Sequence, residues 1–175
     1  VRVGSNEVEF GGLVGGDIAL GAITITGTLD LNSDISNVAS LSVSGTSNLG
    51  ANVTTSGTQT YTGAVTLSGG SRTLTGSTIN TRSTLAGGSN DLTIAGNADV
   101  DGNITGVTNL SVSGTSNLGA NVTTSGTQTY SGAVTLSGGS RTLTGSIINT
   151  GSTVNGGGHS LTITGDADID NSISN

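Results

Sequence analysis

The chain contains no cysteine, proline, methionine or tryptophan, and its basic residues are four arginines and no lysine. Without cysteine, the sequence excludes a disulfide framework, a thiolate-bound zinc and a thiol nucleophile. Eleven acidic residues bring the net charge to −7. That balance excludes the basic stripe that nucleic-acid binding requires. Because methionine is absent, we expect a processed or excised segment.

Long apolar runs and aromatic residues are also scarce. No run approaches the roughly 18 apolar residues that span a bilayer, so we expect no membrane insertion. Aromatic residues make up 2% of the chain. Polysaccharide-cleaving enzymes need carboxylates with a basic partner, usually beside aromatic platforms for sugars. The single histidine, His159, lies at an expected corner with no partner near it in sequence. We therefore expect no enzyme, no catalytic residue and no cofactor-binding residue.

What the chain does contain is repetition. Residues 41–70 return at 110–139 with one change, Thr62 to Ser131, which defines a 69-residue period. A fixed period of this kind indicates a stacked array of structural units.

A five-residue word, aliphatic–Ser/Thr–aliphatic–small–Gly, recurs within the repeat. Its starts are Ile23, Leu41, Val65, Leu92, Leu110, Val134 and Leu161. The 18-, 24- and 27-residue spacings between successive starts together make up the 69-residue period. This spacing predicts a degenerate first turn at 1–22, a three-turn repeat at 23–91, a second at 92–160, and the start of a third at 161–175. Val1 to Gly4 is a weaker copy of the word.

The alternation within each word has the period of a β-strand, and the closing glycine fits a corner with a positive φ. Short strands bent at glycines predict an all-β parallel β-helix, or β-solenoid, of about eight turns of 18–27 residues. The preference of parallel crossovers predicts a right-handed helix. Intrinsic disorder is the alternative, since Gly, Ser and Thr make up about half of the chain. Abundant β-branched residues and a 9% charged fraction argue against it.

Residues 23–175 resemble the repeat regions of large secreted bacterial surface proteins, the filamentous-haemagglutinin-like and beta-strand-repeat adhesins. The resemblance lies in 55–67 (TSGTQTYTGAVTL), its copy at 124–136, and 158–165 (GHSLTITG). It implies a right-handed β-helical shaft, secretion and surface attachment, and it implies no catalytic residues. Residues 1–22 match the pattern poorly.

Two sets of polar residues are candidate binding sites. Four aspartates offer a weak Ca²⁺ site at Asp99, Asp101, Asp168 and Asp170. The second set is a ladder of outward hydroxyls that ice or glycans would bind: Thr24, Thr26, Ser42, Ser44, Thr66, Ser68, Thr93, Ser111, Ser113, Thr135, Ser137, Thr162 and Thr164. Arg72 and Arg141, which share a repeat position, are expected to be solvated surface residues.

The sequence therefore favours a non-enzymatic structural segment of an extracellular bacterial fibre or adhesin shaft. The alternative is a ligand-binding solenoid face for ice or glycans. The expected partners are a second copy, stacked head-to-tail through the end turns, or flanking parts of a longer chain. The uncapped edges of terminal strands, which recruit further strands, support the first partner. The composition suits a protein outside the cell or at its surface.

Overall fold

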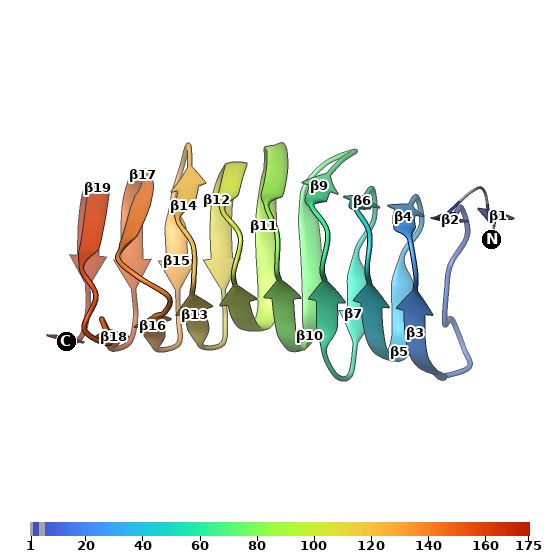
Figure 1. Cartoon of the computed structure of the whole chain (residues 1–175), viewed down its shortest axis with the longest axis horizontal. Helices are drawn as coiled ribbons and strands as arrows, with labels where there is room; N and C mark the ends of the chain where they lie inside the picture. The colour runs from blue at the N-terminus through green and yellow to red at the C-terminus, as the bar shows by residue number, and fades with distance from the viewer. Residues whose placement is uncertain (1, 4–5) are drawn as a thin grey trace.

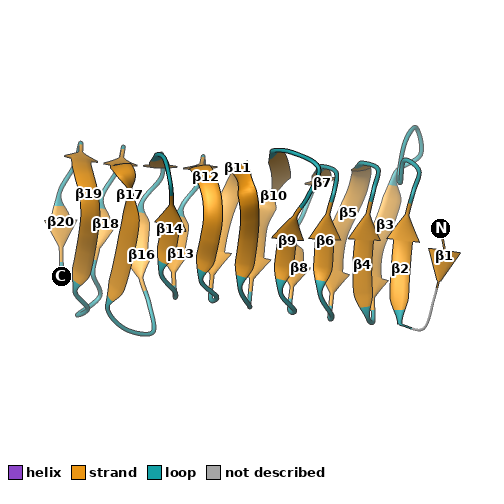
Figure 2. Cartoon of the chain, turned by 90° about the horizontal axis from the view of Figure 1, so that it is seen from above, coloured by secondary structure: helices purple, strands orange, loops and turns teal. Residues whose placement is uncertain are grey.

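The computed structural model describes residues 2–3 and 6–175, and within them the chain is all-β with no helix. Twenty strands form one continuous sheet that winds around a common axis. Apart from β1, every paired strand is parallel to its neighbour in the turns before and after it. Figures 1 and 2 show the turns stacked in a row, with the two termini at opposite ends. The predicted β-solenoid is confirmed, with about nine turns.

The wound sheet has three faces, which the chain visits in a fixed order. Successive turns on the first face contribute β2 (Glu7–Phe10), β4 (Thr28–Leu31), β6 (Ser47–Leu49), β9 (Val65–Leu67), the start of β11 (Leu85–Val100), the start of β12 (Ile104–Val112), β14 (Val122–Thr124), the start of β17 (Arg141–Thr150) and the start of β19 (Leu161–Ile169).

The second face is formed by the start of β5 (Ile35–Val43), β7 (Val53–Thr55), the start of β10 (Arg72–Thr81), the middle of β11, the end of β12, β15 (Gln128–Tyr130) and the ends of β17 and β19. The third face is formed by β3 (Leu20–Ile25), the end of β5, β8 (Gln59–Tyr61), the ends of β10 and β11, β13 (Ser116–Leu118), β16 (Val134–Leu136), β18 (Val154–Asn155) and β20 (Ile173–Ser174).

The pairing of strands fixes the length of a turn. Ile23 pairs with Leu41, and Val53 pairs with Leu74, so one turn is an 18- to 21-residue stretch of chain. The faces follow each other every six residues over much of the chain. Inward positions in this frame are Ile23, Leu29, Ile35, Leu41, Ser47, Val53, Gln59 and Val65. The 24- and 27-residue spacings between words are therefore not turn lengths, because each includes one extra face.

This frame changes the meaning of the 69-residue repeat. From Leu41 to its copy Leu110 the chain passes through eleven face segments, beginning at 41, 47, 53, 59, 65, 72, 79, 85, 92, 98 and 104. Three segments make a turn, so one repeat spans three turns and two further faces. Leu41 consequently lies on the third face and Leu110 on the second. Successive copies of the repeat differ by a rotation of one face.

The word starts do not form a single aliphatic column. Ile23 and Leu41 are paired on the third face, and Leu92 and Leu110 on the second, whereas Val65 lies on the first. The alternation inside each word is confirmed. Leu41 and Val43 are 1% and 0% exposed, while Ser42 between them points outward and is half-buried. Burying each aliphatic side chain contributes on the order of 1.5–3 kcal/mol.

Among the residues that the structure describes, four buried hydroxyls have no hydrogen-bond partner: those of Ser47, Thr81, Ser116 and Thr150. They form two pairs related by the repeat. Thr81 is 1% exposed and occupies an inward column between Tyr61 and Val100. Leaving a buried hydroxyl unpaired costs roughly 1–3 kcal/mol.

We therefore expect Thr81→Val to stabilise the fold by about 1 kcal/mol, since valine has nearly the same shape and no polar atom. The measurement is urea unfolding followed by circular dichroism. Thr55→Val is the matched control, because the Thr55 hydroxyl donates to the Gly57 carbonyl at 2.9 Å. The control should lose about 1 kcal/mol. A less stable Thr81→Val variant would contradict the assignment of an unpaired hydroxyl.

The two end regions depart from the regular pattern. β1 (Arg2–Val3) pairs antiparallel with β2. The sequence predicts that the weaker copy of the word begins a first parallel turn. Arg2 and Val3 instead pair antiparallel, which corrects that prediction, and Val1 and Gly4 lie outside the described residues. On the second face the first turn makes a single bridge, Val14 to Ile35. Three large apolar side chains in this region are exposed, Leu13, Ile18 and Leu20. At the other end, Ile173 is 58% exposed.

Candidate functional surfaces and inter-turn contacts

The predicted hydroxyl ladder is divided among three faces. The first face carries Thr66, Thr162 and Thr164, the second Thr93 and Ser111, and the third Thr24, Ser42 and Thr135. The remaining members lie at or near corners: Thr26, Ser44, Ser68, Ser113 and Ser137. Among the strand positions, two pairs are neighbours on adjacent turns, Thr24–Ser42 and Thr93–Ser111. The arrangement gives no continuous Thr-x-Thr lattice from these residues.

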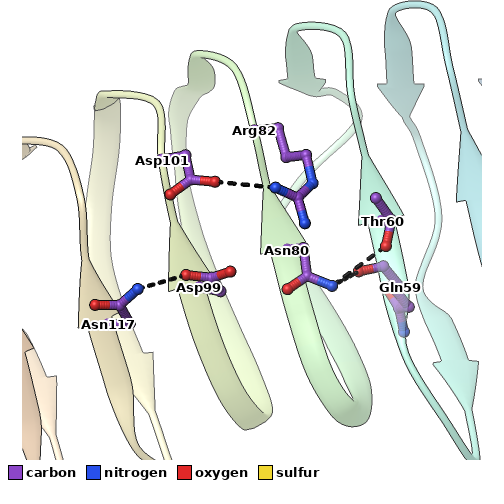
Figure 3. A network of polar contacts seen from close by, with 7 residues as sticks. All are labelled: Gln59, Thr60, Asn80, Arg82, Asp99, Asp101 and Asn117. Atoms are coloured by element: carbon purple, nitrogen blue, oxygen red, sulfur yellow. Dashed lines mark hydrogen bonds and ion pairs between the residues drawn. The ribbon is translucent and has the colours of Figure 1, made fainter. Parts of the chain in front are cut away.

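Sequence analysis missed the outward columns that do form. Each three-residue strand presents one outward side chain between two inward ones. On the third face these side chains follow each other through nine turns, as Thr24, Ser42, Thr60, Asn80, Asp99, Asn117, Thr135, Asn155 and Ser174. Figure 3 shows part of this column, in which the Asn80 amide donates to the Thr60 hydroxyl at 3.2 Å. Six-residue spacing of inward residues was the signal that would have revealed it.

The four aspartates predicted as Ca²⁺ candidates are not brought together. Asp99 lies on the third face and Asp168 on the second. The Asn117 amide donates to Asp99 at 2.8 Å, and Arg82 pairs with Asp101 at 3.4 Å across adjacent turns (Figure 3). Asp168 and Asp170 are exposed near the C-terminal end. In the part of the chain that the structure describes, no three His, Asp or Glu residues cluster so as to hold a metal ion.

Arg72 and Arg141, predicted to be solvated surface residues, are half-buried and also act as inter-turn clamps. Arg72 Nε donates to the Leu49 carbonyl of the preceding turn at 3.1 Å, and Nη1 donates to the Ser71 carbonyl. Nη2 donates to the Ser68 carbonyl. Arg141 binds the equivalent carbonyls in the second repeat.

Each arginine clamp sits where the six-residue frame breaks. The step from Val65 to Arg72 is seven residues, and it is bent by two glycines with positive φ, Gly69 and Gly70. Around this break the carbonyls of Ser68 and Ser71 accept from the guanidinium, and so does that of Leu49, which also accepts from the Ser68 amide. Because a guanidinium has five donors in a rigid fork, it satisfies several of them at once.

A second contact is buried inside the solenoid. The Tyr61 hydroxyl donates to Gln59 Oε1 at 2.9 Å. The Gln59 amide nitrogen donates to the Val53 carbonyl in its own turn and, at 2.8 Å, to the Thr75 carbonyl in the next. Thr55 supplies a further hydroxyl contact. The same contacts recur at Gln128, Tyr130 and Thr124, around the carbonyls of Val122 and Thr144. We call each set a Gln–Tyr–Thr cluster.

The clusters lie beside irregularities in the strand ladder. The register shifts between Thr75 and Thr78, and again between Thr144 and Ile147. Gln59 and Tyr61 are both 0% exposed, as are their repeat equivalents. Buried polar groups at this depth are tolerated because they are hydrogen-bonded to one another. The two tyrosines lie on the third and second faces and do not stack on each other.

Burial raises the pKa of Tyr61 and of Tyr130 far above the usual value near 10. A tyrosine whose pKa is higher in the folded state than in the unfolded state stabilises the protein below the unfolded pKa. This stabilisation is lost as pH rises above the unfolded pKa toward the folded pKa. We therefore expect stability to fall above pH ~10, by about 1.4 kcal/mol per pH unit for each tyrosine.

The measurement is tyrosinate absorbance with pH, read beside circular dichroism. Both tyrosines should ionise only as the fold is lost. Ionisation at pH ~10 with the fold intact would show that the hydroxyls reach solvent.

Asparagine and aspartate side chains at the corners connect further turns. The Asn52 side-chain oxygen accepts from the Thr73 amide, and that of Asn109 accepts from the Thr127 amide. Asn103 and Asn121 accept in the same way from the amides of Asn121 and Thr142. These four residues are also the Asn-x-Ser/Thr sequons of the chain. The corner geometry accounts for the pattern, since an aliphatic inward residue and an outward Ser or Thr follow each corner asparagine.

Two shallow grooves occupy equivalent places in the two repeats. The larger, of about 480 Å³, runs beside Val38 and Thr54–Ser56, and the smaller, of about 300 Å³, runs beside Val107 and residues 123–125. Both lie where a strand register shifts, at Ile35/Val38 and at Ile104/Val107. Neither groove contains an unpaired buried polar side chain among the described residues.

His159 lies at the corner between β18 and β19 and is half-buried, and its backbone amide donates to the Gly156 carbonyl at 2.9 Å. The described residues include no helix that is long and apolar enough to cross a membrane.

Comparison with known proteins adds no relative: no family model, curated protein or solved structure matches the chain.

Proposed function

We propose that the chain is a non-enzymatic structural segment of an extracellular bacterial fibre or adhesin shaft. The observation that carries the proposal is the rotation of the 69-residue repeat by one face. A ligand-binding face requires similar side chains on successive turns of one face. Here a 30-residue block is copied with a single change, but the first copy begins on the third face and the second copy begins on the second face. The repeat therefore preserves the stacking of turns, but it does not place the same side chains on the same face of the solenoid.

The inter-turn contacts support a mechanical role. Strand ladders run along three faces, arginine clamps and corner asparagines tie neighbouring turns, and the Gln–Tyr–Thr clusters tie them from inside. In a stacked array each turn is stabilised by its neighbours, so such contacts stiffen the stack along its axis. The surface, rich in Thr, Ser, Asn and Gly with no lysine, supports placement outside the cell or at its surface.

The first experiment tests the shaft by lengthening it. Inserting three further copies of residues 92–160 after position 160 adds eleven turns and returns the sequence to its original face. At the strand spacing this adds about 53 Å to the rod. We expect electron microscopy and small-angle scattering to show a straight rod lengthened by that amount. A compact or flexible product would overturn the proposal.

The second experiment tests location. Antibodies raised against the folded chain should label intact cells of the organism that makes it, or fibres released from them. Labelling that appears only after the cells are lysed would remove the extracellular part of the proposal.

We also propose head-to-tail contact between copies through the end turns. β19 and β20 are each paired on one side in the described chain, and Ile173 is exposed beside them. Glu7 at one end and Asp166 and Asp168 at the other are exposed and alike in charge, so stacking should require salt. Sedimentation at low salt and at about 0.5 M salt tests this, since added salt screens the repulsion. Concentration-dependent growth in high salt supports the contact, and a monomer under both conditions rejects it.

A further inference from the structure

The Gln–Tyr–Thr clusters divide the stack unevenly. Most interfaces between turns are held by aliphatic packing, by strand ladders and by polar contacts of exposed or half-buried side chains. In the described part of the chain, two interfaces also contain a hydrogen bond from a fully buried glutamine: Gln59 to the Thr75 carbonyl, and Gln128 to the Thr144 carbonyl, each 2.8 Å long. Both bonds are formed by side chains that are 0% exposed. One full repeat of the sequence separates the two interfaces.

Tension on a shaft acts along the line that joins its ends. The termini lie at opposite ends of the stack, and the strands run across the axis (Figures 1 and 2). A pull on the two ends therefore peels turns from the stack one after another, and each strand ladder opens bond by bond. Since each turn contacts only its neighbours, nothing in an aliphatic interface itself halts this process before the next turn.

Peeling behaves differently at a cluster. Removing the turn that contains Thr75 takes one acceptor from the Gln59 amide, whose oxygen accepts from Tyr61. The bond is directional and lies in the interior, so it must break before water can reach the glutamine amide and replace the acceptor, and the cost of this step adds to that of the lost aliphatic contact. The same holds for Gln128 and Tyr130 when the turn that contains Thr144 leaves.

We propose that the two Gln–Tyr–Thr clusters are stops under axial load, so that the shaft yields in units of the 69-residue repeat and not turn by turn. This inference rests on the proposed shaft function, since only a load-bearing protein would use the stops. It gives the 69-residue period a mechanical meaning: the period sets the spacing between points that resist extension.

The experiment is single-molecule extension of the whole chain by handles at its two ends. Extended chain spans at most about 3.3–3.6 Å per residue, so one 69-residue repeat releases roughly 240 Å, whereas one turn releases about 65 Å. We expect two pauses separated by the larger length, from whichever end peeling begins. Release in steps of a single turn, or of the whole chain at once, would overturn the proposal.

Substitutions assign each pause to its cluster. Gln128→Met should abolish the pause on the C-terminal side and keep the other, and Gln59→Met should do the reverse. Thr60→Val, an outward change on the same strand as Gln59, should keep both. Retention of both pauses in either glutamine variant would also overturn the proposal.

A second pair of variants covers the case in which a glutamine variant does not fold. Tyr61→Phe and Tyr130→Phe keep the ring and remove only the hydroxyl, and each should shorten its own pause about tenfold. Unchanged pause lifetimes in both would reject the stops. These outcomes are independent of rod length and of cell labelling, so a failure of the stops is distinguishable from a failure of the shaft function.

Discussion

Val43→Asp is expected to destabilise the chain by about 3–5 kcal/mol, because it places an unpaired carboxylate in the interior. Val43 is 0% exposed and lies in an inward column between Ile25 and Tyr61. A turn cannot offset its own ordering entropy without its neighbours, so the loss should spread to the adjacent turns. Urea unfolding followed by circular dichroism gives the difference from the unsubstituted chain.

The matched control is Ser42→Asp, one residue away. Ser42 points outward in a column between Thr24 and Thr60, so its substitution should change stability by less than about 0.5 kcal/mol. Burial raises the pKa of an introduced carboxyl above its unfolded value near 4. The penalty of Val43→Asp should therefore be small below pH ~4 and grow as pH rises. Equal stability of the two variants at neutral pH would show that residues 41–43 do not alternate as described.

The fold class could be predicted because it depends on local alternation. Each word places its two aliphatic residues inward and its hydroxyl residues outward, and this holds wherever the word occurs. Glycine closes every word, and five of the seven closing glycines have a positive φ: Gly27, Gly69, Gly96, Gly138 and Gly165. These are properties of a few adjacent residues, which a sequence displays directly.

The faces could not be assigned in the same way, because some inward positions are polar. Ser47 and Gln59 occupy the six-residue frame at places where an aliphatic residue is expected. Both are buried, at 2% and 0% exposed. Because these inward positions are polar, the sequence displays only the five-residue words, at 18-, 24- and 27-residue spacings. Each word is then interpreted as one turn. The rotation of the repeat becomes visible only from the pairing of strands.

The functional contacts were missed for a related reason. Arg72 carries a charge and follows two glycines and a serine, features typical of an exposed loop. Its position is decided by carbonyl groups of Leu49 and Ser68, and a sequence does not display where backbone carbonyls point. Where the six-residue frame breaks, the arginine side chain adds hydrogen bonds to corner carbonyls. An arginine clamp can therefore be predicted only if the break in the six-residue frame beside it is recognised as well.

Gly96→Ala is expected to destabilise the chain by about 3 kcal/mol, because it combines backbone strain with a steric clash. Gly96 has a φ of 149° at a corner, and a Cβ there would lie 1.9 Å from the Gly76 carbonyl oxygen of the preceding turn. The neighbouring atom belongs to the backbone, so the two turns would have to separate. Gly165 has the same relation to Gly145 in the second repeat.

Two further glycines separate the two causes in the same urea unfolding measurement. Gly70 has a φ of 132° with nothing within 4 Å of an added Cβ, so Gly70→Ala should show the strain alone, at about 1 kcal/mol. Gly12 has open space around it and no positive φ, so Gly12→Ala should be nearly neutral. If Gly96→Ala were no worse than Gly70→Ala, the close approach of turns at this corner would be refuted. Because coupling runs between neighbouring turns, hydrogen exchange in Gly96→Ala should rise first in the turns that contain Gly76 and Gly96.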